Sequence, residues 1–497
     1  MVDKPVGMAA SLPNGPELGA VEWLRLHHSR IASVFSPIDT ATSGVLVLAK
    51  DPSLLENPTA CVYEYLFWSQ RKANATVMHS KWKHSESAHA KSVTTEFEFT
   101  QHANGYDCYR ARTDQPDPAV VYRHALASGV PVAGSKGCCN PQLPRAMLHR
   151  TQISGVLWPH SLSAPLPPTF EAMMASHPSF PLTLACCQDR RLGWIRSISN
   201  AIRVVHRDEL PDCPFACEVY DDVLSVWAYD PKMDTASFAQ AYRAEIERLM
   251  NTYQCRSALV RSMNRNPHRR QLSQGGYWIG DPQTTPFWVE EHQLKYRIQI
   301  SETKHTGLFL DQRDSRRKLS LATKGKRVAN LFAFTCSFSQ VAVAAQAEVV
   351  FSVDLAKGCL KTGIENLKAN QLEQLGVGKF VQEDARNWLN RQLRRKYRDS
   401  DSYPYFDWVI CDPPVFAASS KASAFKVAEE WQMLVKQCAA ILCPTGKAIF
   451  ANNHRGGEAH LYQSILNEPF TAVTQLAPPI DFPDTGKTHV RTFWCEK

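Results

Sequence analysis

The feature that most constrains this sequence is the alternation of short apolar runs with helical patterns across residues 301–497. Val328–Phe334 and Val349–Val353 are apolar runs of strand length, and a helix-like segment, Phe338–Ala347, lies between them. Phe406–Cys411 is a further apolar run of the same kind. Strands that alternate with helices predict parallel βαβ units, so this part of the chain is expected to form a doubly wound, Rossmann-like α/β domain.

Polar residues stand where these strands would end, at Thr335, Asp354, Asp384 and Asp412. The carboxyl ends of parallel strands meet at one edge of the sheet, so these side chains are expected to lie together. In a Rossmann-like unit, an acidic residue about 20 positions after the first strand-to-helix turn binds the ribose of a cofactor. Asp354 has that spacing from Thr335. The pyrophosphate fingerprint G-x-G-x-x-G is absent, which favours S-adenosylmethionine over a nicotinamide dinucleotide; an ordinary βαβ pair is the alternative.

The residues at the ends of the third and fourth strands can bind a base or an adenine group. A carboxylate at Asp384 can accept a hydrogen bond from an adenine amine. In Asp412-Pro413-Pro414-Val415-Phe416, the prolines fix φ at about −65° and remove two backbone donors. The Asp412 carboxylate and the loop carbonyls can then face a base, and Phe416 can stack on an extruded base. A β-turn without further function is the alternative for Asp-Pro-Pro taken alone.

The segment from about 280 to 497 resembles the class I S-adenosylmethionine-dependent rRNA methyltransferases of the RlmI and RlmK type. The motifs that carry the resemblance are Glu290-Glu291-His292, Thr306 to Arg316, Asn330-Leu331-Phe332-Ala333-Phe334-Thr335, Asp354-Leu355, Asp412 to Phe416, and Phe450-Ala451-Asn452-Asn453-His454-Arg455-Gly456. This resemblance implies a large-subunit (23S) rRNA substrate.

The resemblance also implies two sets of site residues. The cofactor-binding set is Asn330, Phe332, Thr335, Asp354, Leu355, Asp384, Ala385 and Asp412. The catalytic set, which would receive the flipped base, is Asp412, Pro413, Pro414 and Phe416. The chain departs from the family in one respect: Cys336 and Ser337 follow the threonine, where the family has glycine. Their side chains are expected to crowd the methionine part of the cofactor.

Asn452 bears on the target atom, because the RlmI-type strand has a cysteine there and cytosine C5 methylation needs a cysteine nucleophile. The Asn452–Gly456 segment is more similar to the RlmK type, which implies methylation of guanine N7. Cytosine C5 methylation through Cys411 or Cys443 is the alternative. Two alternatives belong to other functional classes. One is a pseudouridine synthase, and the other is an RNA-binding assembly factor without catalytic activity.

Residues 1–175 resemble an RluA-type pseudouridine synthase, an α+β fold, on the segments Val2–Gly7, Asp39–Lys50 and His124–Pro131. Asp39 falls at the catalytic aspartate and Tyr65 at the active-site tyrosine of that family. The arginine-containing run that would accompany Asp39 is replaced by Gln115–Tyr122, which holds no arginine. This region is therefore expected to be a degenerate synthase that binds RNA or supports the rest of the chain.

Residues 180–300 are expected to form a small α+β RNA-binding domain. The run Val223–Ala228 predicts a strand, and Phe238–Tyr253 has the spacing of one helix. Two basic clusters are candidates for phosphate contacts, although the second also fits a solvated helix face. Their members are Arg261, Arg265, His268, Arg269 and Arg270, and then Arg391, Arg394, Arg395, Lys396 and Arg398.

Composition limits the class of protein. The formal charge of +8 permits an anionic partner, and no stretch has the length and apolarity of a membrane span. The 15 cysteines include the adjacent pairs Cys138-Cys139 and Cys186-Cys187, which favours reduced thiols. With Cys213 and Cys217 they match no common zinc spacing, so no metal is expected. The start of the chain lacks a signal-like pattern, and a cytoplasmic location is expected.

Overall fold

The computed structural model divides the chain into two compact units, residues 1–194 and 195–497. It describes all residues except 13–17, 31, 52–60, 71–80, 89–90, 136–142, 144, 156–157, 159, 175–193, 207–212, 231, 263–275, 284–285, 301–304, 420–421, 455–458 and 483–489. Several residues of the sequence predictions lie outside the described residues, namely Cys138, Cys139, Cys186, Cys187, Arg265, His268, Arg269, Arg270, Arg455 and Gly456.

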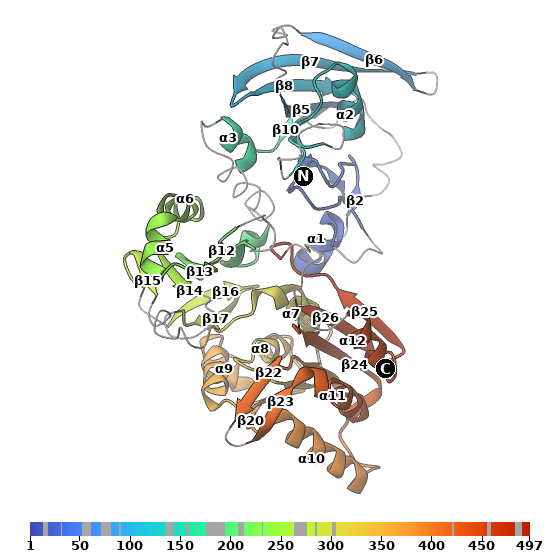
Figure 1. The fold of residues 1–497 in the computed structure, drawn as a ribbon. Coiled ribbons are helices and arrows are strands. Elements are labelled where there is room, and N and C mark those ends of the chain that lie inside the picture. The colour runs from blue at the N-terminus through green and yellow to red at the C-terminus, as the bar shows by residue number, and fades with distance from the viewer. Residues whose placement is uncertain are drawn as a thin grey trace. The chain divides into compact units, whose positions relative to one another are not determined.

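The central sheet of the second unit has the strand order β20-β19-β18-β21-β24-β26-β25 (Figure 1). Its strands are β18 (Arg327–Leu331), β19 (Val349–Asp354), β20 (Gly378–Gln382), β21 (Phe406–Cys411), β24 (Leu442–Asn452), β25 (Ala472–Leu476) and β26 (Arg491–Glu496). Neighbouring strands are parallel except at β26, which runs antiparallel to both β24 and β25. The α/β architecture predicted for residues 301–497 is confirmed.

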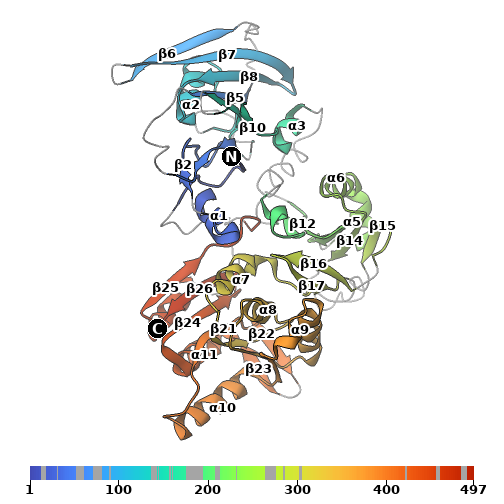
Figure 2. The same ribbon diagram turned by 180° about the vertical axis from the view of Figure 1, so that it is seen from behind.

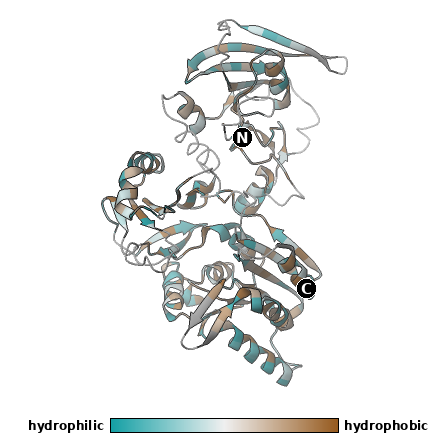
Figure 3. Ribbon diagram, viewed as in Figure 1, coloured by the Kyte–Doolittle hydropathy of each residue, from teal (hydrophilic) through white to brown (hydrophobic). Residues whose placement is uncertain are grey.

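Helices cover both faces of this sheet (Figures 1 and 2). They are α7 (Arg313–Ser320), α8 (Ser337–Ala344), α9 (Lys357–Ala369), α10 (Ala385–Arg398), α11 (Val427–Ile441) and α12 (Ala459–Leu466). Alternate residues of one strand enter different cores: Val328 packs with α8 and α9, and Ala329 packs with α10 and α11. Because both faces are buried, the inner strands are apolar throughout, whereas α10 shows a largely hydrophilic outer surface (Figure 3).

A second sheet in this unit has the order β11-β12-β13-β14-β15. Its elements are β11 (Ala201–Val205), β12 (Phe215–Tyr220), β13 (Val223–Ala228), β14 (Ser257–Ser262), β15 (Tyr277–Gly280) and the helices α5 (Thr235–Ala241) and α6 (Arg243–Tyr253). The predicted strand Val223–Ala228 is confirmed, but the single helix predicted over Phe238–Tyr253 is wrong. The helix breaks at Tyr242, whose backbone has φ −111° and ψ 22° and whose ring packs 4.6 Å from that of Phe238.

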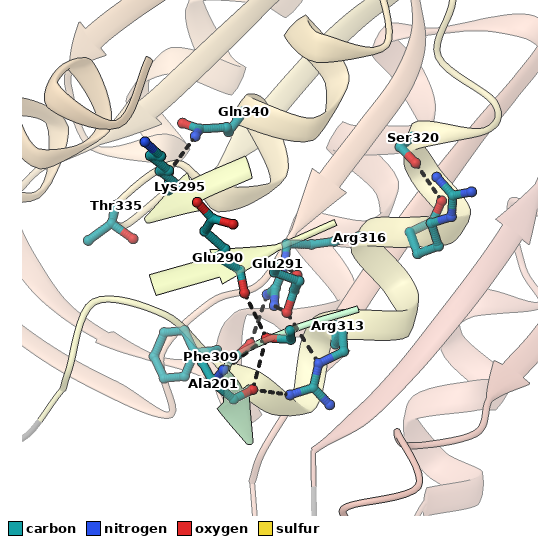
Figure 4. Close-up of polar contacts among 12 residues, drawn as sticks. Ala201, Glu290, Glu291, Lys295, Phe309, Arg313, Arg316, Ser320, Thr335 and Gln340 are labelled. Carbon is teal, nitrogen blue, oxygen red and sulfur yellow. Dashed lines mark hydrogen bonds and ion pairs between the residues drawn. The ribbon is translucent and has the colours of Figure 1, made fainter. Parts of the chain in front are cut away.

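A buried ionic network joins the sheet β11–β15 to α7, one of the helices that cover the central sheet (Figure 4). Glu291 ends β16 (Phe287–Glu291), which forms a hairpin with β17 (Leu294–Ile298). Its carboxylate accepts hydrogen bonds from Arg316 Nε at 2.8 Å and Arg316 Nη2 at 2.9 Å, and Arg313 Nε lies 3.3 Å away. Arg313 also donates to Asp481 Oδ1 at 2.6 Å and to the carbonyl of Ala201 at 2.7 Å.

The charged members of this network are almost fully enclosed. Side-chain exposure is 1% for Arg313 and Arg316, 2% for Glu291 and 0% for Asp481. Burial opposes the ionisation of Glu291, but Arg316 and Arg313 hold its pKa below the usual range. The network therefore fixes the hairpin, α7, β11 and the segment after β25 to one another.

The first unit contains a mixed sheet of order β1-β3-β9-β5-β8-β7-β6, with β10 paired to β9. Its elements are β1 (Val2–Lys4), α1 (Ala20–His28), β2 (Ser33–Val34), β3 (Ser43–Leu46), β4 (Leu48–Ala49), β5 (Cys61–Gln70), β6 (Trp82–Ala88), β7 (Lys91–Ala103), β8 (Tyr106–Thr113), α2 (Pro118–Ala127), β9 (Leu148–Gly155), β10 (Leu162–Ser163) and α3 (Pro168–Met174). The strands β3 and β9 are parallel, and the long strands β5 to β9 pair antiparallel. The likeness of this unit to pseudouridine synthases stays a prediction.

Removing the negative charge of the network is expected to destabilise the second unit. Glu291→Gln leaves two buried guanidinium groups without their shared carboxylate, and a broken buried pair costs about 3–5 kcal/mol. Glu247→Gln is the control, because Glu247 pairs with Arg243 on an exposed helix surface, where such a pair is worth about 0.3–0.5 kcal/mol. Urea unfolding monitored by hydrogen exchange in β18 and β21 measures both. Equal losses in the two variants would contradict the role given to the network.

Candidate functional site

A cavity of about 860 Å³ opens at the carboxyl ends of the inner strands of the second unit. Most of the predicted site residues line it: Asn330, Phe332, Asp354, Leu355, Asp384, Ala385, Asp412, Pro413, Pro414 and Phe416. The parallel strand order brings them together from four separate segments of the chain. A volume of this size accommodates an extended nucleoside-containing cofactor with room for a substrate group.

The turn after β18 has an unusual backbone. Phe332, Phe334 and Cys336 have φ values of 55°, 48° and 63°, in the left-handed region that favours glycine. Hydrogen bonds hold the turn: the N–H of Ala333 donates to the Val353 carbonyl at 3.0 Å, and the N–H of Cys336 donates to the Ala333 carbonyl at 2.7 Å. The strained turn presents Phe332, Ala333 and Phe334 to the cavity.

Asp354 completes this turn. Its Oδ2 accepts a hydrogen bond from the N–H of Phe334 at 2.8 Å, and its Oδ1 accepts one from the N–H of Ala356 at 2.7 Å. Burial raises the pKa of Asp354, while these two backbone donors oppose the shift. Each oxygen retains a lone pair, and Asp354 lines the cavity, so the carboxylate can accept two ribose hydroxyls as the sequence predicts.

Thr335 and Cys336 lie behind the turn, outside the cavity lining. Thr335 Oγ1 donates to the carbonyl of Gly307 at 2.6 Å, so this side chain secures the preceding segment. The Cys336 thiol packs against α9, where a Cβ added at Gly363 would lie 2.5 Å from the sulfur. For Cys336 the expected crowding of the cofactor is wrong in this geometry, because the left-handed backbone turns the thiol away from the cavity. Ser337 lines the cavity, so for that residue the expectation stays a prediction.

Asp384 caps α10, and its carboxylate is paired with Arg386. Its Oδ1 accepts from the N–H of Arg386 at 2.9 Å, and its Oδ2 accepts from Arg386 Nη2 at 2.7 Å. The same guanidinium donates to Glu430 at 2.9 Å. Burial opposes ionisation, but the hydrogen bonds from Arg386 hold the pKa of Asp384 below its usual value. Asp384 is thus an anion at neutral pH and lies at the cavity wall.

Asp412 and Phe416 face the cavity from the end of β21. Asp412 accepts no hydrogen bond from another described residue, and burial raises its pKa to about 7, with a further contribution from the Asp311 carboxylate. Phe416 begins the β22 (Phe416–Ser419) and β23 (Ala422–Lys426) hairpin and is 57% exposed, which leaves its ring available for stacking.

The structure adds lining residues to which the sequence analysis assigned no role. Among them are His305, Phe309, Asp311, Gln312, Arg316, Phe334, Arg386, Phe425 and Asn453. The segment His305–Gln312 precedes the strand–helix alternation, so strand-end reasoning did not reach it. Thr306 to Arg316 is one of the motifs that carry the family resemblance, but that resemblance assigned no site role to Phe309 or Asp311.

No cysteine belongs to the described lining of the cavity. Asn452 is buried, with Oδ1 accepting the N–H of His454 at 2.8 Å, and its neighbour Asn453 reaches the cavity instead. Cys411 is fully buried in β21, where hydrogen bonding to Cys438 and burial raise its pKa well above that of a free thiol. Cys443 lies at the start of β24, away from the carboxyl end of that strand.

Asp39 and Tyr65 of the first unit have different surroundings. Asp39 is exposed, and its Oδ1 accepts the N–H of Thr42 at 2.7 Å, as a turn-capping carboxylate does. Tyr65 is fully buried, and its hydroxyl accepts hydrogen bonds from Arg150 at 2.7 and 3.0 Å. Arg150, which the sequence analysis missed, also donates to the Pro37 carbonyl at 2.9 Å. In the described residues no arginine pairs with Asp39.

Most described members of the predicted phosphate-binding clusters make contacts within the protein. Arg261 is buried, stacks 3.7 Å from the Trp227 ring centroid and donates to the Ile300 carbonyl at 2.6 Å. A role for Arg261 in phosphate contact is therefore wrong. On α10, Arg391 pairs with Glu383, and both Arg395 and Arg398 pair with Asp399.

Comparison with known proteins gives a consistent result. Residues 217–490, more than half of the chain, match the sequence profile of the family described as "S-adenosylmethionine-dependent methyltransferase". The ribosomal RNA large subunit methyltransferase K/L of Alteromonas mediterranea is 27% identical over 302 residues, which cover 60% of this chain and 41% of the relative. The protein of that name from Pseudoalteromonas translucida is 27% identical over 271 residues, 53% of this chain and 36% of the relative. The chain thus spans about two fifths of the length of these relatives.

Solved structures share the fold. The crystal structure of SMU.776 complexed with SAH has a TM-score of 0.53 and 22% identity, and covers 68% of this chain and 83% of that chain. A SAM-dependent methyltransferase structure from Streptococcus mutans has a TM-score of 0.51 and 21% identity, with the same coverage. These likenesses show that the fold of the second unit is shared with the two structures.

Asp354→Ala is expected to weaken the binding of S-adenosylhomocysteine. The substitution removes the acceptor for two ribose hydroxyls and the carboxylate that holds the Phe334 turn, so the loss should be about 2–4 kcal/mol, or 30- to 1,000-fold in Kd. Isothermal calorimetry measures the change. Asp399→Ala is the control, since Asp399 caps the far end of α10 outside the cavity. An unchanged Kd for folded Asp354→Ala protein would contradict the site assignment.

Proposed function

Because the chain belongs to the family of S-adenosylmethionine-dependent methyltransferases, we propose that it methylates a base of large-subunit (23S) ribosomal RNA, at guanine N7. The cofactor follows from the family. The substrate rests on one observation: the curated relatives it matches are named ribosomal RNA large subunit methyltransferases.

The residues at the carboxyl edge of the sheet form two groups, one for the cofactor and one for the target base. When bound, S-adenosylmethionine supplies an electrophilic methyl group. Asp354 would hold the ribose of the cofactor, and Phe332, Leu355 and the segment Asp384–Ala385 would enclose its nucleoside part. Asp412, Pro413, Pro414 and Phe416 hold the extruded base, with the ring of Phe416 stacked against it. Guanine N7 is already nucleophilic, so the protein needs only to position it and exclude water.

The cytosine C5 alternative has less support. That reaction requires a thiolate that adds to C6 of the base, but the described cavity lining contains no cysteine. The raised pKa of Cys411 also disfavours its thiolate. Asn453, which lines the cavity, fits a site that binds a base without covalent attack.

For the first unit we propose RNA binding or support without synthase chemistry. Asp39 is a turn-capping residue, and the buried guanidinium of Arg150 bonds to Tyr65 and to backbone carbonyls. A synthase would need an arginine beside the catalytic carboxylate. We propose a cytoplasmic location, where ribosomal RNA is available. Among the described helices, none has the length and apolarity to cross a membrane.

Guanine N7 methylation predicts a specific chemical signature. Unmodified 23S rRNA transcript incubated with the protein and S-adenosylmethionine should gain one site that cleaves after borohydride reduction and aniline treatment, as N7-methylguanosine does. Cys411→Ser and Cys443→Ser should retain that activity within about threefold, because no thiol takes part. A transcript containing 5-fluorocytidine should form no covalent adduct in denaturing electrophoresis. An adduct that disappears in one cysteine variant would establish the cytosine C5 reaction instead.

Asp39→Ala is expected to leave the pseudouridine content of rRNA unchanged, because the carboxylate caps a turn and has no arginine partner in the described structure. Mass mapping of rRNA from cells that carry only the variant measures this. Loss of one specific pseudouridine, with methylation intact, would show that the first unit is a working synthase.

A further inference from the structure

The cavity contains two kinds of carboxylate. Asp354 and Asp384 accept hydrogen bonds from backbone N–H groups, and Asp384 is also paired with Arg386. Asp311 and Asp412 line the same cavity, but neither accepts a hydrogen bond or forms an ion pair with another described residue. Two acceptors in one partly buried site thus remain available for a ligand, and the structure assigns no internal role to them.

Asp311 comes from outside the strand ends. It lies in a short 3₁₀ turn, Leu310–Gln312, immediately before α7. The network at Arg316 fixes this turn, because Arg316 Nη1 donates to the Phe309 carbonyl at 2.7 Å while its other nitrogens bind Glu291. Asp311 is close enough to Asp412 for its charge to raise the pKa of that carboxyl. A rigid support therefore holds the second carboxylate near the first.

Aromatic side chains accompany this pair. The rings of Phe309 and Phe334 lie 5.2 Å apart, and that of His305 lies 5.5 Å from Phe309. Phe309 is 38% exposed and Phe416 is 57% exposed, and all four side chains line the cavity. Aromatic faces combined with hydrogen-bond acceptors are the set with which proteins recognise a single unstacked base.

We propose that Asp311 is a base-recognition residue which, together with Asp412, accepts hydrogen bonds from the N1–H and 2-amino groups of the target guanine. This inference rests on the proposed function. Guanine presents these two adjacent donors on its Watson–Crick edge, whereas cytosine and adenine each present an amine next to a ring nitrogen that accepts. Two ionised carboxylates therefore match guanine and leave an acceptor facing an acceptor with either other base.

Inosine tests the assignment, because it lacks only the 2-amino group of guanine. The methylated position is mapped first with wild-type protein, and short RNAs are then made with guanosine or inosine at that position. Wild-type protein should favour guanosine by at least tenfold in kcat/KM, since a carboxylate that loses its donor stays unpaired. Asp311→Asn should reduce this preference at least fivefold. Its Kd for S-adenosylhomocysteine should stay within twofold of wild type, which also shows that the variant is folded.

A pH profile gives an independent readout. Since the acceptors must be ionised, kcat/KM should fall as the pH is lowered through about 7, the pKa of Asp412. Asp311→Asn removes the neighbouring negative charge, so this limb should move to lower pH. The charged groups that act on Asp311 are Arg203, Arg316 and Glu218, and all three stay in place in the variant. Asp401→Asn, on the surface outside the cavity, is the control and should match wild type.

The outcomes separate the two claims. If wild-type protein methylates no guanine in rRNA, the proposed function fails. If it does, but Asp311→Asn keeps the full preference for guanosine over inosine, the inference about Asp311 is overturned. A tenfold or greater loss of S-adenosylhomocysteine affinity in Asp311→Asn would overturn it as well, and would place Asp311 with the cofactor.

Discussion

The buried contact between Glu291 and its two arginines is the interaction on which the second unit depends. Ion pairs in a protein interior stabilise a fold only when every charge has a partner with good geometry, because desolvation is expensive. Here Arg316 binds Glu291 through two nitrogens (Figure 4). Arg313 links the same carboxylate to Asp481. The pairs bring together the β16–β17 hairpin, α7 and the segment after β25, which lie far apart in the sequence.

The same network reaches the cavity through the backbone. Arg316 donates to the Phe309 carbonyl, and Thr335 donates to the Gly307 carbonyl, so the 305–312 segment is held at two points near its middle. Asp354 in turn holds the strained Phe334 turn through a backbone N–H. The positions of the cavity residues are therefore set by buried polar contacts behind them. Such support is what a methyl-transfer site requires, since positioning contributes much of the rate.

Cys336, at the position where the family resemblance implies glycine, illustrates how local strain is accommodated. Cys336 adopts a left-handed φ of 63°, which is unfavourable for a residue with a Cβ. Glycine at position 363 leaves room for the thiol against α9. The cavity is unaffected because the side chain lies on the opposite side of the turn. A sequence comparison of this one position predicts a defect, while the packing around it explains why the fold accepts the change.

The sequence alone determined the α/β architecture of residues 301–497 and the meeting of Asp354, Asp384 and Asp412, because apolar periodicity and polar strand ends are local signals and the carboxyl ends of parallel strands must meet. Most of the other predicted cavity residues came from the resemblance to known methyltransferases. The sequence also marked Asp39 and Tyr65, but not the burial of Arg150, which bonds to Tyr65 and to backbone carbonyls. Tertiary structure decided what local patterns do not encode: that Asp311 joins Asp412, that Asp384 pairs with Arg386, that Thr335 and Cys336 turn away, and that the helix breaks at Tyr242. The orientations of Thr335 and Cys336 and the meeting of Asp311 with Asp412 depend on contacts between segments distant in the chain. The Asp384–Arg386 pair and the Tyr242–Phe238 ring contact are local, but there too burial or charge pairing overrides local propensity.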